Sequence, residues 1–134
     1  MAGRLSVDTT FLIDLQRERS SGVEGPANAL LAEDPEVELF LPSVALGEFA
    51  EGFEDADHPV LRVVRDLHVL LPIDEETALA YGRLTRHLRG RGELLGANDL
   101  WIAASTLRHE LRLVTADAAG FRRVPGLELA TYRG

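Results

Sequence analysis

Short apolar runs alternate with longer amphipathic stretches along the whole chain of 134 residues. Apolar runs of about four to eight residues between turn-forming residues predict buried strands, whereas apolar positions recurring every three to four residues predict helices. The predicted strands cover residues 4–8, 37–42, 68–73, 111–117 and 127–132. The predicted helices cover residues 9–19, 26–33, 43–53, 60–67, 75–90 and 98–110, with a single helical turn at 118–124.

Several helix ends carry recognisable signals. Pro26 is placed to open the second helix, and Ser43 and Asp74 are placed to cap the third and the fifth. Gly90 is expected to end the fifth helix.

The alternation of strands and helices predicts an α/β fold, an α/β/α sandwich whose central, mainly parallel sheet is flanked by helices. The length predicts one domain over residues 1–134. In such folds the carboxyl ends of the strands meet at one edge, which is where binding sites form. Acidic residues from distant parts of the chain fall at that edge.

The candidate site consists of four acids. Asp8 and Asp117 stand at the ends of the first and fourth predicted strands, whereas Glu48 and Asp99 lie in the first turns of two predicted helices. Carboxylates about 4 Å apart repel each other by roughly 4 kcal/mol at an effective dielectric constant near 20. Shared protons or a bound hard cation offset such repulsion. Oxygen ligands without cysteine or a histidine motif favour Mg²⁺ or Mn²⁺ over zinc.

Each acid also has a purely structural interpretation. Asp8 suits an Asx-turn with Thr10, and Asp117 suits an ordinary turn. Asp99 suits a helix N-cap, although Asn98 can cap equally well and leave Asp99 facing inward.

Glu48 has two acidic neighbours that compete for its role. Glu51 lies one turn further along, and Glu54 belongs to the acidic run "EDAD", which is typical of a solvated surface.

The composition narrows the possible functions. The net charge of −8 argues against a general nucleic-acid coat, and the complete absence of lysine removes mechanisms that need an amine. The chain has no cysteine, and its start fits neither a signal peptide nor a membrane span. We therefore expect a cytoplasmic protein that does not interact with membranes.

Two other folds with acidic Mg²⁺ sites fit less well. A receiver-type signalling domain requires paired acids after its first strand and a lysine near its end. A haloacid-type phosphatase requires Asp-x-Asp at the first strand, where this chain has "VDTT".

Four segments, in order, resemble the signature segments of PIN-domain ribonucleases, and specifically VapC-type toxins: "VDTTFLIDL", "PSVALGEFAEG", "NDLWIAAS" and "LVTADAAGFRRVPGLEL". The resemblance implies an RNA-cleaving enzyme that uses Mg²⁺ or Mn²⁺, forms a homodimer and is held inactive by a VapB-type antitoxin. It implies that the four acids form the site. Asp8, Asp99 and Asp117 are then expected to bind the metal ion, and Glu48 is expected to position or deprotonate the attacking water. The remaining alternative within the family is a catalytically silent PIN-like scaffold.

The resemblance also selects among neighbouring residues. Its "E-hydrophobic-x-x-G" element matches "EFAEG", which points to Glu48 rather than Glu51. The family often has Asn or Ser where this chain has Thr10, whose hydroxyl can still hold a carboxylate or a metal-bound water. Thr115 is expected to support the site in a similar way.

Basic and aromatic residues outside these segments have open interpretations. Five residues near the end of the fifth helix form the most basic patch, which suits either RNA phosphates or a solvated helix terminus: Arg83, Arg86, His87, Arg89 and Arg91. Arg122 and Arg123 closely follow the fourth acid and are better placed to meet substrate or an acidic partner. Trp101 suits the core or a dimer interface more than a base-stacking surface.

Overall fold

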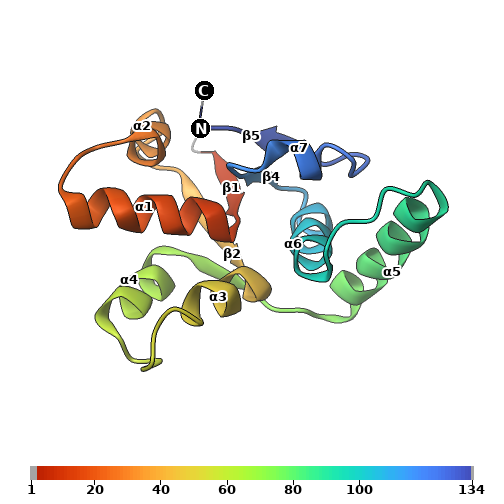
Figure 1. Ribbon diagram of the computed structural model, residues 1–134, viewed down its shortest axis with the longest axis horizontal. Helices are drawn as coiled ribbons and strands as arrows, with labels where there is room; N and C mark the ends of the chain where they lie inside the picture. Colours follow the sequence, from red (N-terminus) through yellow and green to blue (C-terminus); the bar gives the residue numbers. More distant parts are fainter. Residues whose placement is uncertain (1–2, 134) are drawn as a thin grey trace.

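The computed structural model describes residues 3–133, and within them five strands form one parallel sheet (Figure 1). The strand order is β3-β2-β1-β4-β5, and every pairing is parallel. The strands are β1 (Arg4–Val7), β2 (Glu38–Pro42), β3 (Val69–Leu71), β4 (Arg112–Val114) and β5 (Leu129–Ala130). The predicted α/β class with a parallel central sheet is confirmed.

Seven helices connect these strands within the described residues. They are α1 (Thr9–Ser21), α2 (Pro26–Ala32), α3 (Ser43–Ala50), α4 (Pro59–Leu67), α5 (Glu75–Gly90), α6 (Ala97–Arg108) and α7 (Ala118–Phe121). Figure 1 shows α1, α2 and α4 to one side of the sheet, and α5 and α6 to the other. None of the helices described between residues 3 and 133 is both long and apolar enough to cross a membrane.

The strand order places the carboxyl ends of β1 and β4 side by side at the middle of the sheet. From β1 the chain adds β2 and β3 in one direction, and it later returns to add β4 and β5 in the other. Parallel α/β sheets bind ligands where the strand order reverses in this way. The backbone N–H of Asp8 also donates to the carbonyl of Val114, 3.2 Å away, so the two strand ends are joined directly at this point.

The apolar core locks α1 and α6 against opposite faces of the sheet. Phe11 and Leu12 of α1 and Ile102 and Ala103 of α6 are almost fully buried. Helices anchored so firmly hold the polar residues at their first turns in fixed places, and both first turns lie at the carboxyl edge of the sheet.

The strands are shorter than predicted, and this changes two of the proposed site positions. Strand β1 ends at Val7, so Asp8 is the N-cap of α1 rather than the last residue of a strand. Strand β4 ends at Val114, and Asp117 stands at the N-cap position of α7. The N–H groups of Asp8 and Thr115 still donate to backbone carbonyls of the neighbouring strands, and the N–H groups of Ala116 and Asp117 then donate to threonine hydroxyls.

Two of the predicted helix caps are corrected. Helix α3 follows Pro42 directly, and the hydroxyl of Ser43 donates to the carbonyl of Leu71 at 2.8 Å instead of capping. Helix α5 ends at Gly90 as predicted, and Gly92, two residues further on, has a left-handed backbone at φ 67°. Helix α6 begins one residue early with Gly96 as its N-cap, so Asn98 is not a cap. Pro26 and Asp74 begin α2 and α5 as predicted.

Candidate functional site

Asp8 is the buried centre of the candidate site. Its Oδ1 accepts hydrogen bonds from the Thr10 hydroxyl at 2.7 Å and the Phe11 backbone N–H at 3.0 Å. Its Oδ2 accepts a hydrogen bond of 2.5 Å from the Thr115 hydroxyl. Burial raises the pKa of Asp8 above its usual value despite these three donors, and the charge of Asp117 raises it further.

Thr10 and Thr115 connect Asp8 to the segment that follows β4. The Thr10 hydroxyl accepts a hydrogen bond from the backbone N–H of Ala116 at 3.1 Å, and the Thr115 hydroxyl accepts one from the N–H of Asp117 at 2.9 Å. Each threonine therefore donates to the carboxylate and accepts from a backbone N–H of the segment that follows β4. This network fixes where Asp117 lies relative to Asp8.

Asp99 lies in the first turn of α6 and faces the other acids. Burial raises its pKa, and the charges of Glu48, Asp117 and Asp8 each raise it further. Hydrogen bonds place the acids in one region, because Thr115 links Asp8 to the N–H of Asp117 and Glu48 accepts from Asn98, the neighbour of Asp99. Within the described residues, no arginine or histidine forms an ion pair with any of them.

Glu48 on α3 is held by two residues whose part in the site the sequence did not reveal. Thr9 donates its hydroxyl to Oε1 at 2.7 Å, and Asn98 donates its carboxamide to Oε2 at 3.2 Å. From the sequence, Thr9 was assigned no role beside its neighbour Asp8, and Asn98 was interpreted only as a cap. Their adjacency to Asp8 and Asp99 was the available signal.

Asp117 is the fourth acid of the site, and its carboxylate makes no hydrogen bond to the helix that it precedes. It occupies the N-cap position of α7, but its side chain makes no capping hydrogen bond. Unlike Asp8, it is exposed. Its carboxylate is therefore open to solvent or to a ligand.

The acids approach one another but are not packed into a ready-made cage. Among residues 3–133, no three acidic or histidine side chains are already spaced to hold one metal ion. Mg²⁺ typically takes one or two protein carboxylates and keeps several waters, so it does not require such a cage. Carboxylate oxygens whose charge no nearby cation balances fit a hard divalent ion.

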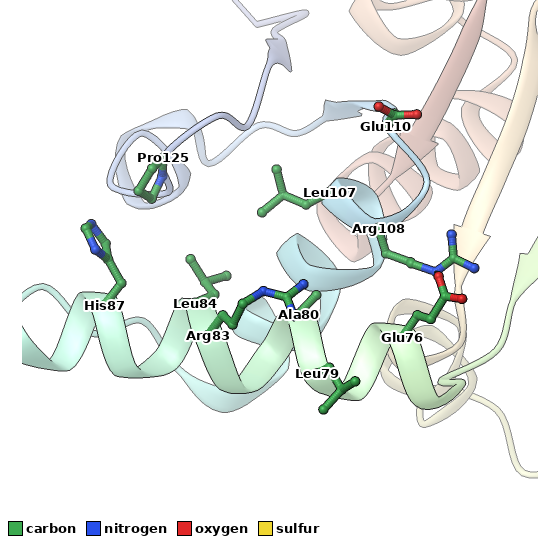
Figure 2. Close-up of a pocket in the computed structure, with 10 residues that line it drawn as sticks. All are labelled: Glu76, Leu79, Ala80, Arg83, Leu84, His87, Leu107, Arg108, Glu110 and Pro125. Atoms are coloured by element: carbon green, nitrogen blue, oxygen red, sulfur yellow. The ribbon is translucent and has the colours of Figure 1, made fainter.

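A separate hollow of about 640 Å³ lies between α5, the end of α6 and the segment after α7 (Figure 2). Arg83 and His87 of the predicted basic patch contribute to its lining, together with Arg108, which pairs with Glu76 at 2.9 Å. None of the four acids lines it. The hollow is therefore distinct from the acidic site.

The other singled-out residues lie at the surface or between helices. Trp101 of α6 stacks on Tyr81 of α5, with ring centroids 3.8 Å apart, and so joins the two helices. Arg122 and Arg123 are exposed beyond α7, and Arg123 donates to the carbonyl of Leu94 at 3.4 Å.

The chain is thus a parallel α/β domain with an acidic site where its strand order reverses, and within the described residues the four acids form no ion pair. The sequence profile of the PIN domain family matches residues 5–127, and the chain belongs to this family. Ribonuclease VapC1 of Haemophilus influenzae strain R2866 is 29% identical over 125 residues, covering 91% of this chain and 92% of the relative. Ribonuclease VapC1 of Methanocaldococcus jannaschii is 27% identical over 131 residues, covering 96% and 87%.

Solved structures share the fold over almost the whole chain. VapBC2 of Rickettsia felis, bound to a DNA fragment from its promoter, contains a chain with a TM-score of 0.81 at 20% identity, covering 97% of this chain and 99% of that one. DNA-bound VapBC of Salmonella typhimurium also gives a TM-score of 0.81, at 22% identity, covering 99% and 100%.

Proposed function

We propose that the chain is an endoribonuclease that depends on Mg²⁺, with Mn²⁺ as a possible substitute, and that residues 1–134 form a single PIN domain. The convergence of four acids at the reversal of strand order, with no ion pair to any of them within the described residues, carries this proposal. The relatives named as ribonucleases support RNA as the substrate.

The proposed roles follow from where each side chain lies. Asp8, Asp99 and Asp117 would hold the divalent cation, and Thr10 and Thr115 fix the orientation of Asp8. A bound cation polarises a phosphodiester and lowers the pKa of water. Glu48, held by its two donors, orients the attacking water and accepts its proton. The new phosphorus–oxygen bond replaces the bond to the 3′ oxygen, which takes up a proton, so the products carry 5′-phosphate and 3′-hydroxyl ends.

RNA cleavage with and without metal tests this function. The purified chain is expected to cut a labelled RNA in Mg²⁺ or Mn²⁺ and to stop in EDTA, with restoration by excess metal. Asp8→Asn is expected to lower the cleavage rate by about 10²-fold or more, because a buried electrostatic contribution to the site is lost. Asp66→Asn removes an exposed carboxylate from α4 and serves as the matched control. Undiminished cleavage by a folded Asp8→Asn protein would contradict the assignment.

We further propose that the chain acts in the cytoplasm as the toxin of a type II pair, as a homodimer neutralised by a VapB-type antitoxin. The VapBC complexes among the structures of the same fold support this proposal. Induced expression in a bacterium is expected to stop growth, and Asp99→Asn is expected to abolish the effect. Co-expression of the small protein encoded beside the toxin gene should restore growth. Growth arrest that persists with Asp99→Asn would separate toxicity from this site.

A further inference from the structure

We propose that Thr9 and Asn98 are positioning residues that fix the carboxylate of Glu48 for the cleavage reaction. This inference rests on the proposed function. The Thr9 hydroxyl lies 2.7 Å from Oε1 and the Asn98 carboxamide nitrogen lies 3.2 Å from Oε2, so each carboxylate oxygen has its own donor. An ionised carboxylate is purely an acceptor, and donors on both oxygens fix the plane of the group as well as its position.

The fold brings these donors from opposite faces of the sheet. Helix α3 contacts both α1 and α6, and so crosses the carboxyl edge between them (Figure 1). Thr9 is the first residue of α1, and Asn98 lies in the first turn of α6. Both helix N-termini also favour a negative charge through their backbone dipoles. Glu48 thus bridges two helices that are anchored independently in the core.

The hydrogen bonds from Thr9 and Asn98 oppose the electrostatic repulsion between Glu48 and the other acids. Glu48 and Asp99 carry like charges: burial raises the pKa of Asp99, and the charge of Glu48 raises it further. A partly exposed glutamate without fixed donors would turn towards solvent, away from the other acids. Thr9 and Asn98 offset that tendency and keep the carboxylate at the edge where the attacking water must lie.

Kinetics separate positioning from simple structural support. Thr9→Val and Asn98→Ala are each expected to lower kcat by about 10- to 100-fold, while KM for RNA changes less than about threefold. Thr9→Ser keeps the hydroxyl and should restore most of kcat. In a Glu48→Gln background, neither substitution should lower kcat further, because both act through the group already removed.

A second readout needs neither RNA nor metal. The sequence contains only three side-chain carboxamides, in Gln16, Asn28 and Asn98, so ¹⁵N–¹H NMR shows three NH₂ pairs that single substitutions assign. Glu48→Ala is expected to shift the Asn98 pair and speed its hydrogen exchange while the Asn28 pair stays unchanged.

Asn28 provides the matched control for this measurement. Its carboxamide donates to Glu18 at 2.9 Å, the same chemistry at the other end of α1. Glu18→Ala should therefore shift the Asn28 pair and leave the Asn98 pair in place.

The outcomes distinguish this inference from the function on which it rests. The inference would be overturned if the NH₂ resonances of Asn98 did not shift in Glu48→Ala. It would also be overturned if Thr9→Val and Asn98→Ala both kept full kcat while cleavage still required metal. The second result would leave the proposed function intact. If the wild-type chain shows no metal-dependent cleavage, the proposed function fails and the positioning role fails with it. Loss of kcat with the NMR shift, rescue by Thr9→Ser and non-additivity would establish the role.

Discussion

Asp99→Asn is expected to lower RNA cleavage by about 10²- to 10³-fold and, in the same protein, to raise the melting temperature without metal. Asp99 is half-buried beside three other acids, so its ionised form is costly to the fold. Removing a partly screened repulsion of about 0.5–1 kcal/mol corresponds to a rise in Tm of about 2–4 °C. A gain in stability with a loss of activity is typical of residues kept for function.

The stabilisation should depend on pH in a defined direction. Folding raises the pKa of Asp99 above its ordinary value of 3.8, so the folded chain holds this proton more tightly than the unfolded chain. Below pH 3.8 the Asp99 carboxyl is mostly neutral in both the folded and the unfolded chain. The destabilisation from its charge appears as the pH rises through the raised pKa of the folded state. The Tm advantage of Asp99→Asn should therefore grow from acid to neutral pH in EDTA, and the exposed substitution Asp66→Asn is measured beside it as the control. A Tm advantage that shrank with pH would contradict the account.

Phe11→Ala is expected to have the largest effect on stability, a loss of about 3–5 kcal/mol in the free energy of unfolding. The ring is fully buried and meets Tyr132 edge-to-face, with centroids 5.2 Å apart. Alanine keeps the backbone N–H that donates to Asp8. The variant therefore tests the packing of α1 rather than the hydrogen bond to the site, and urea unfolding measures it.

Ile13 offers a control on the same helix. Its side chain is 37% exposed, so Ile13→Ala should cost about 1 kcal/mol or less. Equal losses from the two substitutions would show that α1 is not packed as described.

The alternation of apolar runs was sufficient to predict the fold class, because parallel sheets bury both faces and their strands are apolar throughout. The order of strands was not predictable from those runs. The position of β4 beside β1 depends on pairing between residues more than 100 positions apart, such as Ser6 with Leu113. The end of the fourth strand was overestimated because the sequence pattern continues to Asp117, whereas the backbone N–H groups of Ala116 and Asp117 donate to threonine hydroxyls.

The proposed site acids were selected because Asp8 and Asp117 follow strands and Asp99 opens a helix at the same edge, while Glu48 was selected mainly by the resemblance of its segment to a family. The residues that orient them were harder to predict. Asn98 is of a residue type that often caps helices. Because α6 begins earlier, at Ala97, the side chain of Asn98 is free to reach Glu48. The contact between Thr9 and Glu48 spans 39 positions and has no local signature.

A cleavage assay that compares Asp8→Asn, Asp99→Asn and the double variant in saturating Mg²⁺ tests the central claim most directly. If these acids serve one metal-dependent site, each single substitution removes most of the activity, and the double variant is much less impaired than the product of the two losses predicts. RNA ends carrying 5′-phosphate should disappear in all three. Cleavage that persists in the folded double variant, or losses that multiply fully, would contradict a single site built from these acids.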